Sequence, residues 1–192
     1  MDIKDKIPFY NIMNMFFVGA VFSLCLVFFL HSYIPFEWIK ENAELLSDWS
    51  ILISAILFIV MYELGFIINR MGSIIIAPIY EGKKGGKFNI WPKEEYGIDV
   101  SELAKANPRF QSMITELNLM RSHIMMYLIL LILSLLMGEW LWSVIFVLLI
   151  VIFTFGGKKH NTKINIIRKQ AFERKEKENQ EVQKTKEYLD IS

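Results

Sequence analysis

The apolar residues of this chain lie in three long runs, and the charged residues lie almost entirely between them. The runs cover residues 12–30, 51–69 and 124–155; the first has no charged residue, the second has Glu63 and the third has Glu139. A helix needs about 20 predominantly apolar residues to cross the roughly 30 Å hydrocarbon core of a bilayer. The first two runs therefore each predict one membrane-spanning helix.

The third run has two interpretations. A single helix over it would be about 48 Å long, which is more than the hydrocarbon core requires. Two shorter helices joined at Gly138 and Glu139 would each have roughly 15–17 residues. Because Trp140 and Trp142 follow, this junction has the composition of an interfacial turn. We therefore expect a hairpin here, and four spans in all.

The distribution of basic residues favours four spans and sets their orientation. Segments 1–11, 70–122 and 157–192 would lie on one side of the membrane, and they hold 20 of the 21 Lys and Arg residues. Lys40 is alone on the other side. By the positive-inside rule both termini are cytoplasmic. A three-span chain would instead place the ten basic residues of the tail outside.

These patterns predict an all-α polytopic membrane protein with four transmembrane helices in two hairpins and helical cytoplasmic extensions. The first hairpin, with an acidic outer loop, covers 1–69, and a cytoplasmic insertion covers 70–122. The second hairpin covers 123–156, and a charged cytoplasmic tail covers 157–192. For the tail, a solvated and partly disordered helix and a short coiled coil between subunits are both open.

Prolines predict where two helices change course. Pro78 lacks an N–H and disfavours helix in the residue before it, so we expect the second helix to run past the membrane and end at Ala77. Asn107 followed by Pro108 has the pattern of an N-cap and a first helical residue. The third span is therefore expected to begin in the cytoplasm at this point.

Composition narrows the chemistry further. The chain is 54% apolar and 21% charged with a net charge of +1, which predicts no nucleic-acid partner. The single cysteine, Cys25, excludes an intramolecular disulfide and a cysteine-based zinc site. The three histidines are scattered, and the residues show no nucleophile–base pattern. We expect no catalytic residues, no cofactor and no metal, and hence no enzyme.

Glu63 is the ionisable residue placed well inside a span, and Asn14 lies at comparable depth in the first span. A carboxylate there costs about 2.5–3.5 kcal/mol on insertion scales, so it must face protein or water. We take Glu63, Asn14 and Asn69 as candidates for lining or gating a pore. The alternative is a structural carboxylate bonded to one of the nearby polar residues Asn69, Arg70, Arg121 and His123.

Five basic residues are candidates for coupling the spans to the cytoplasm. Arg70 and Arg121 lie at the membrane interface, where anchoring or a loop salt bridge is the alternative role. Lys83, Lys84 and Lys87 lie in a Gly- and Lys-rich turn that lacks the spacing of a phosphate loop. This turn is interpreted as flexible and basic, with an anion-binding loop as the alternative.

Gly19 and Ser23 are four residues apart on the first span, a spacing that lets helices approach closely. We expect this face to pack subunits together in a homo-oligomer within the bilayer, with a tetramer as the working number.

Two short segments carry a resemblance to a known class of proteins. Residues 63–73, followed by Pro78, are similar to a span ending in Gly-x-x-x-x-Arg-x-Gly-Ser, and residues 116–121 resemble the approach to a third span. The pattern resembles small four-span inner-membrane proteins of bacterial antiphage defence systems, of the Kiwa membrane protein or Hailong membrane effector type. The resemblance implies an inner-membrane homo-oligomer that works with a cytosolic protein or a nucleotide signal.

Two functions remain open from the sequence. One is a gated pore or membrane-perturbing effector controlled from the cytoplasm. The other is a non-conducting membrane sensor or scaffold that docks a cytosolic defence partner.

The charge asymmetry makes the topology testable. Reporters fused after Ser192 and near Gly85 should be active in the cytoplasm, and a reporter near Asn42 should be active in the periplasm. The measurement is a pair of reporters, one active on each side of the membrane. A periplasmic C-terminus would contradict both the four spans and the turn at Gly138.

Overall fold

A computed structural model of the chain describes residues 3–30, 36–81, 90–91, 96–97, 102–103 and 107–190. The described residues are helical almost throughout and include no strand. Four helices are long and apolar enough to cross a membrane: α1 (Ile3–Phe29), α4 (Ser50–Met71) with its continuation, α7 (Pro108–Leu136) and α8 (Trp140–Asp190). The predicted all-helical fold with four spans is confirmed, and the chain is a multi-pass membrane protein in its architecture.

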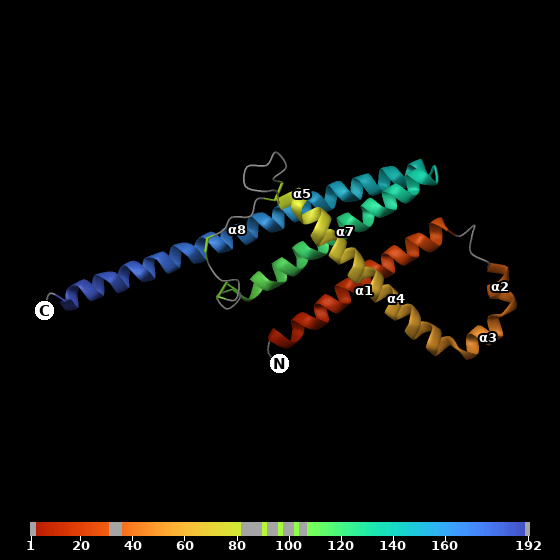
Figure 1. The fold of residues 1–192 in the computed structure, drawn as a ribbon, viewed down its shortest axis with the longest axis horizontal. Coiled ribbons are helices and arrows are strands. Elements are labelled where there is room, and N and C mark those ends of the chain that lie inside the picture. Colours follow the sequence, from red (N-terminus) through yellow and green to blue (C-terminus); the bar gives the residue numbers. More distant parts are fainter. Residues whose placement is uncertain are drawn as a thin grey trace.

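The four spans form two pairs (Figure 1). α7 and α8 lie side by side as an antiparallel hairpin, whereas α1 and α4 cross each other. The short helices α2 (Phe36–Glu41) and α3 (Ala43–Asp48) lie at the same end of the molecule as the α7–α8 turn. The start of α1 and the long extension of α8 lie toward the other end, as a four-span chain requires.

The predicted turn between the last two spans is confirmed at residues 137–139. Gly138 has φ 75°, a left-handed conformation that glycine adopts without strain. Just inside the turn, the hydroxyls of Ser134 and Ser143 lie 2.8 Å apart, and both side chains are buried. Each hydroxyl also lies within hydrogen-bond distance of a main-chain carbonyl, that of Leu131 at 2.9 Å and that of Glu139 at 3.1 Å, so both buried groups are satisfied within the hairpin.

The two helices of the first pair touch through glycines. A Cβ added to Gly19 would lie 1.6 Å from the carbonyl oxygen of Met61, and one added to Gly65 would lie 1.7 Å from that of Met15. The prediction that the face of Gly19 and Ser23 joins subunits is therefore corrected for Gly19. Its open side is filled by α4 of the same chain, and the close approach it allows occurs within one subunit.

The expected end of the second helix at Ala77 is wrong. After α4 the chain makes a π-helical turn, η2 (Gly72–Ile76), and continues through Pro78 as α5 (Ala77–Glu81). The N–H of Ala77 bonds the carbonyl of Gly72, five residues back. In an ordinary α-helix the proline ring collides with the carbonyl four residues before it, and the wider π turn relieves that collision.

The third span begins where the sequence predicts. The Asn107 side chain accepts a hydrogen bond from the Arg109 N–H at 3.0 Å, and Pro108 is the first helical residue. α8 is 51 residues long, or about 76 Å, and runs through Gly156 and Gly157 into the tail. The tail is thus helical to Asp190, with the described side chains from 172 to 184 exposed.

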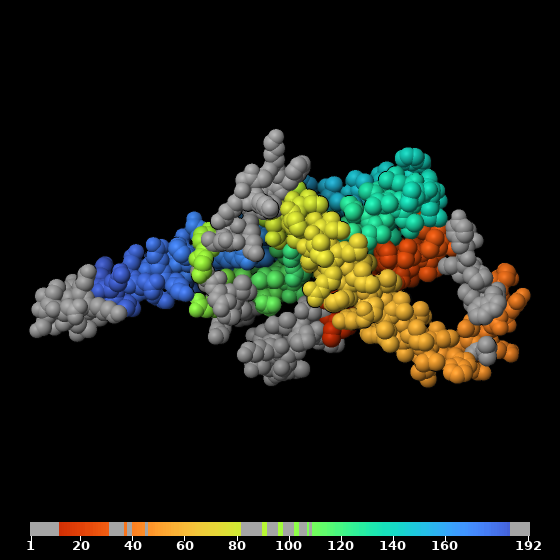
Figure 2. Space-filling model, in the orientation of Figure 1, coloured from red at the N-terminus to blue at the C-terminus, as the bar shows by residue number. Residues whose placement is uncertain are grey.

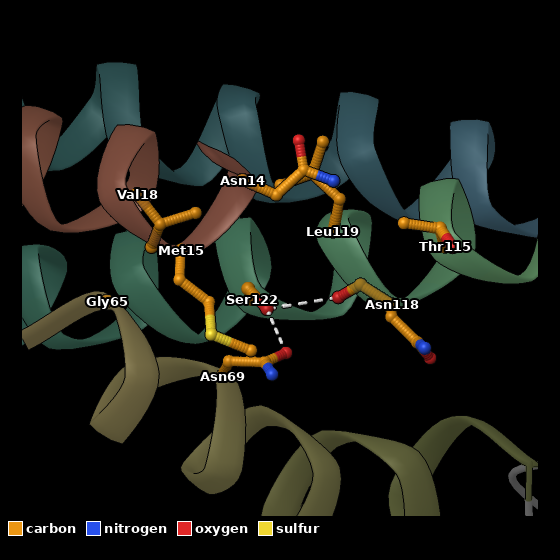
Figure 3. Close-up of a pocket in the computed structure, with 9 residues that line it drawn as sticks. All are labelled: Asn14, Met15, Val18, Gly65, Asn69, Thr115, Asn118, Leu119 and Ser122. Atoms are coloured by element: carbon orange, nitrogen blue, oxygen red, sulfur yellow. Dashed lines mark hydrogen bonds between the residues drawn. The ribbon is translucent and has the colours of Figure 1, made fainter. Parts of the chain in front are cut away.

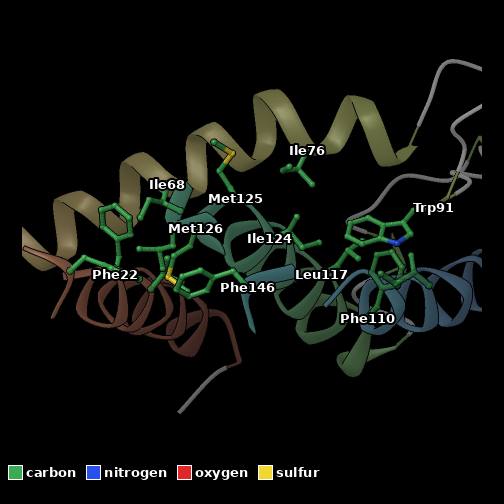
Figure 4. Packing of buried hydrophobic residues seen from close by; sticks show 14 of the residues in the cluster. Phe22, Ile68, Ile76, Trp91, Phe110, Leu117, Ile124, Met125, Met126 and Phe146 are labelled. Carbon is green, nitrogen blue, oxygen red and sulfur yellow. The ribbon is translucent and has the colours of Figure 1, made fainter. Parts of the chain in front are cut away.

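One apolar core joins all four spans (Figure 4). Its centre is the middle of α7, where Ile124, Met126 and Leu130 are almost completely buried. Phe22 of α1, Ile68 of α4 and Phe146 of α8 pack around it. α7 is therefore the helix against which the others are placed.

The glycine contact can be tested directly. Gly19→Ala should lower the unfolding temperature in mild detergent, because the new methyl group must push the α1 and α4 backbones apart. We expect the free energy of unfolding to fall by about 1–3 kcal/mol. Ala55→Leu, on the exposed surface of α4, is the matched control and should unfold as wild type. Dissociation of an oligomer without any loss of subunit stability would restore the role between subunits.

Candidate functional site

A small polar cavity lies between α1, α4 and α7, near the predicted cytoplasmic ends of these spans (Figure 3). Its volume is about 100 Å³. Polar residues of all three helices line it, and none of the lining residues is charged. The lining consists of Asn14, Met15, Val18, Gly65, Asn69, Thr115, Asn118, Leu119 and Ser122.

A chain of polar contacts leads into this cavity from the end of α5. The Ser122 hydroxyl lies 2.7 Å from Oδ1 of Asn69 and 3.0 Å from the main-chain oxygen of Asn118. Oδ1 of Asn118 accepts a hydrogen bond from the guanidinium of Arg121. Arg121 also forms a salt bridge with Glu81, with 3.1 Å between Nη1 and Oε1. The cavity is thereby connected to the predicted cytoplasmic surface.

Two predicted intramembrane candidates, Asn14 and Asn69, are brought together at this cavity. The sequence analysis missed Thr115, Asn118 and Ser122. Their spacing of three and four residues places them on one face of a helix, so a signal was present. It was overlooked because these residues precede the third apolar run and were assigned to the cytoplasmic insertion.

Glu63 lies away from the cavity, on the exposed face of α4. Its neighbours one turn away, Ile59, Val60 and Ile67, are 58%, 45% and 51% exposed. Glu63 forms no hydrogen bond or ion pair with any residue that the structure describes. The alternative of a buried carboxylate bonded inside the chain is therefore not observed.

The two interfacial arginines have separate positions. The Arg70 guanidinium lies over the Phe66 ring, 5.0 Å from its centroid, and is exposed. Arg121 is half-buried in its salt bridge, which is the alternative role considered for it. A coupling role remains a prediction for both. The other coupling candidates, Lys83, Lys84 and Lys87, lie outside the described residues.

Trp91 of the insertion is fully buried, and sequence reasoning gave it no role. Its ring lies against Gly157 of α8, where an added Cβ would be 2.1 Å from a ring carbon. The indole N–H donates to the Thr154 carbonyl at 3.2 Å, and the main-chain N–H donates to the Tyr80 carbonyl at 2.7 Å. Trp91 thus ties the end of α5 to α8.

Other described parts of the insertion also follow α8. The rings of Tyr96 and Phe172 lie 5.6 Å apart, and Glu102 pairs with Lys175 at 3.1 Å. Leu103 is buried beside them. These described parts of the insertion therefore lie along the extension of α8.

No family model, curated protein or solved structure matches the chain. Within the described ranges, no group of three or more His, Cys, Asp or Glu side chains could hold a metal ion. The resemblance to antiphage membrane proteins therefore stays a prediction.

The Trp91 anchor has a matched pair of substitutions. Gly157→Ala should displace the indole and lower the free energy of unfolding by about 1–3 kcal/mol. Gly156→Ala places its methyl group 3.5 Å from Met120, an ordinary contact, and should be neutral or stabilising because alanine favours helix. The measurements are thermal unfolding and the rate of tryptic cleavage within the insertion.

Faster cleavage is expected for Gly157→Ala alone. Equal stability and equal cleavage rates in the two variants would show that Trp91 does not occupy this position in the protein.

Proposed function

We propose that the chain is a subunit of a homo-oligomeric membrane effector, a gated pore or membrane-perturbing assembly controlled from the cytoplasm. The observation that carries the proposal is the exposed, unpaired Glu63 on α4. Only 11% of the residues in the apolar part of the α4 span are buried inside the chain, against 17–33% in the other three spans. Its exposed surface lies across the front of the molecule (Figure 2).

The exposed face of α4 continues on both sides of Glu63. Residues spaced three and four apart lie on one side of a helix, and here they form a stripe of exposed side chains. We call this set the α4 stripe: Leu52, Ile56, Ile59, Val60, Glu63, Ile67, Arg70 and Ile74. It is apolar apart from Glu63 and Arg70, as a surface in the hydrocarbon should be.

A carboxylate in the middle of such a stripe is costly if it meets lipid. No polar group of the described chain covers it, so the favourable partners are water or another subunit at the same depth. An oligomer formed through the α4 stripe would turn Glu63 toward a shared polar path. This replaces the contact through Gly19 that the sequence suggested.

Control from the cytoplasm follows from how α4 ends. Its continuation through η2 and α5 is bound at two points, by the Arg121–Glu81 salt bridge and by the anchor of Trp91. A π turn in a helix commonly marks a functional site, because its bonding pattern can change. A signal acting on the insertion would therefore reach α4 and Glu63 directly.

The resemblance of residues 63–73 suggests the setting of this activity. We propose a bacterial inner-membrane effector of antiphage defence that responds to a cytosolic protein or a nucleotide signal. We propose a tetramer as the assembled form.

The second candidate is a non-conducting scaffold. The observation that favours it is the extension of α8, whose side chains from 172 to 184 are exposed over several turns. Such a helix offers a long docking surface for a cytosolic partner. In that case Glu63 would lie against another membrane subunit without any conducting path.

Glu63→Gln separates these two functions. It preserves the shape of the side chain and removes its charge, so folding and assembly should survive. If Glu63 faces a polar path, ion flux through reconstituted vesicles should change by about tenfold or more, since one charge in a low-dielectric site is worth more than 1.4 kcal/mol. The measurement is flux, accompanied by gel filtration of the same preparation.

Glu139→Gln, in the exposed turn, is the charge-matched control and should leave flux unchanged. Ile67→Cys, in a Cys25→Ala background, should cross-link between subunits if the α4 stripe is the interface. Cross-linking with unaltered flux in Glu63→Gln would favour the scaffold. A monomer that does not cross-link would exclude both forms of assembly.

A further inference from the structure

We infer that the cavity between α1, α4 and α7 is a binding site for a compact anion, taken either from solution or as the phosphate of a lipid headgroup. The inference concerns one subunit and does not depend on Glu63 or on the oligomer.

The first observation is a pair of buried donors without acceptors. Nδ2 of Asn14 and Nε of Arg121 are both inaccessible to solvent and have no hydrogen-bond partner in the described chain. Asn14 lines the cavity, and Arg121 is one hydrogen bond behind it through Asn118. Buried polar groups are nearly always satisfied by protein, water or a bound ion. The unpaired Nδ2 of Asn14 in the cavity lining therefore indicates a missing acceptor.

The second observation is the use already made of the amide oxygens. Oδ1 of Asn69 lies within hydrogen-bond distance of Ser122, and Oδ1 of Asn118 accepts from Arg121. The Nδ2 groups of Asn69 and Asn118 have no acceptor among the described residues. Among these amide groups, the Nδ2 of Asn14 is the one that is both buried and without an acceptor in the described chain.

The same arrangement disfavours a cation. Mg²⁺ and Ca²⁺ are bound through oxygen ligands, usually with carboxylates. The cavity lining has no carboxylate, and two of its three amide oxygens are occupied. The Arg121 guanidinium, whose charge is paired with Glu81, donates to Oδ1 of Asn118 and so polarises that amide toward binding a negative group.

The size of the cavity limits the guest. About 100 Å³ corresponds to roughly three water molecules, so a halide, a nitrate or a single phosphate group is the appropriate scale. The cavity lies toward the predicted cytoplasmic ends of the spans, and so on the side of the membrane that cytoplasmic anions and inner-leaflet headgroups share. Both sources of anion can therefore reach it.

The test is the unfolding temperature of the full chain in a non-ionic detergent, followed by tryptophan fluorescence. Chloride, nitrate or inorganic phosphate replaces gluconate at constant ionic strength, because gluconate is too large for the cavity. We expect a saturable rise of about 3–6 °C at ten times the Kd. In a parallel series in gluconate, phosphatidylglycerol or phosphatidylcholine is added to the micelles.

The variants assign the response to this cavity. Asn14→Leu, similar in size but without the donor, should remove the saturable rise, whereas Asn179→Leu on the exposed tail should retain it. If Asn14→Leu does not fold, Asn14→Asp provides the second test, since a carboxylate would repel an anion.

A rise with free anions identifies a solution ligand, and a rise with phosphatidylglycerol alone identifies a headgroup. Wild-type protein whose unfolding temperature responds to neither would overturn the inference and leave a cavity filled by water. A response that persists in Asn14→Asp would also overturn it, because the anion would then bind elsewhere.

Discussion

The backbone contact between α1 and α4 at Gly19 and Gly65 is the constraint on which the rest of the structure depends. Because each glycine lies against a carbonyl of the other helix, no side chain can intervene and the crossing point is fixed. That crossing turns one side of α4 inward and leaves Glu63, two residues before Gly65, on the opposite side. It also brings Asn14 and Asn69, each about one turn from its glycine, to the same cavity beside α7.

The spans, their number and the hairpin at Gly138 were predictable because they depend on local properties. The length of an apolar run, the basic residues that flank it and a glycine beside tryptophans are all properties of short sequence segments. They can be recognised without knowing which distant residues are in contact. Which helices pack against each other is not a local property of the sequence. A small-residue pair such as Gly19 and Ser23 shows that close approach is allowed, and it does not say which helix approaches. The orientation of Glu63 was hidden for a related reason, since α4 is apolar all round and has no periodic face.

Contacts between distant segments account for the rest of what the sequence could not show. Trp91 is 66 residues from Gly157 in the chain, and nothing near either residue identifies the other. Pro78 was read by the rule for an α-helix, and the π turn before it changed the geometry to which the rule applies. The polar face of Thr115, Asn118 and Ser122 was periodic and readable, but it lay outside the segment defined as a span.

α4 connects the two polar features that the structure keeps apart. Asn69 lines the cavity and accepts a hydrogen bond from Ser122 there. Glu63 lies on the exposed α4 stripe, six residues earlier on the same helix. Between them Gly65 touches α1, so a change that tilts the cytoplasmic end of α4 must pivot near this contact. Displacement of Asn69 on one side of the pivot then moves the outer part of the α4 stripe on the other. If the α4 stripe is the subunit interface, both the occupancy of the cavity and the anchor of Trp91 act on assembly through this single helix. Because Glu63 lies close to the pivot, such a tilt changes the orientation of its side chain more than its depth in the membrane.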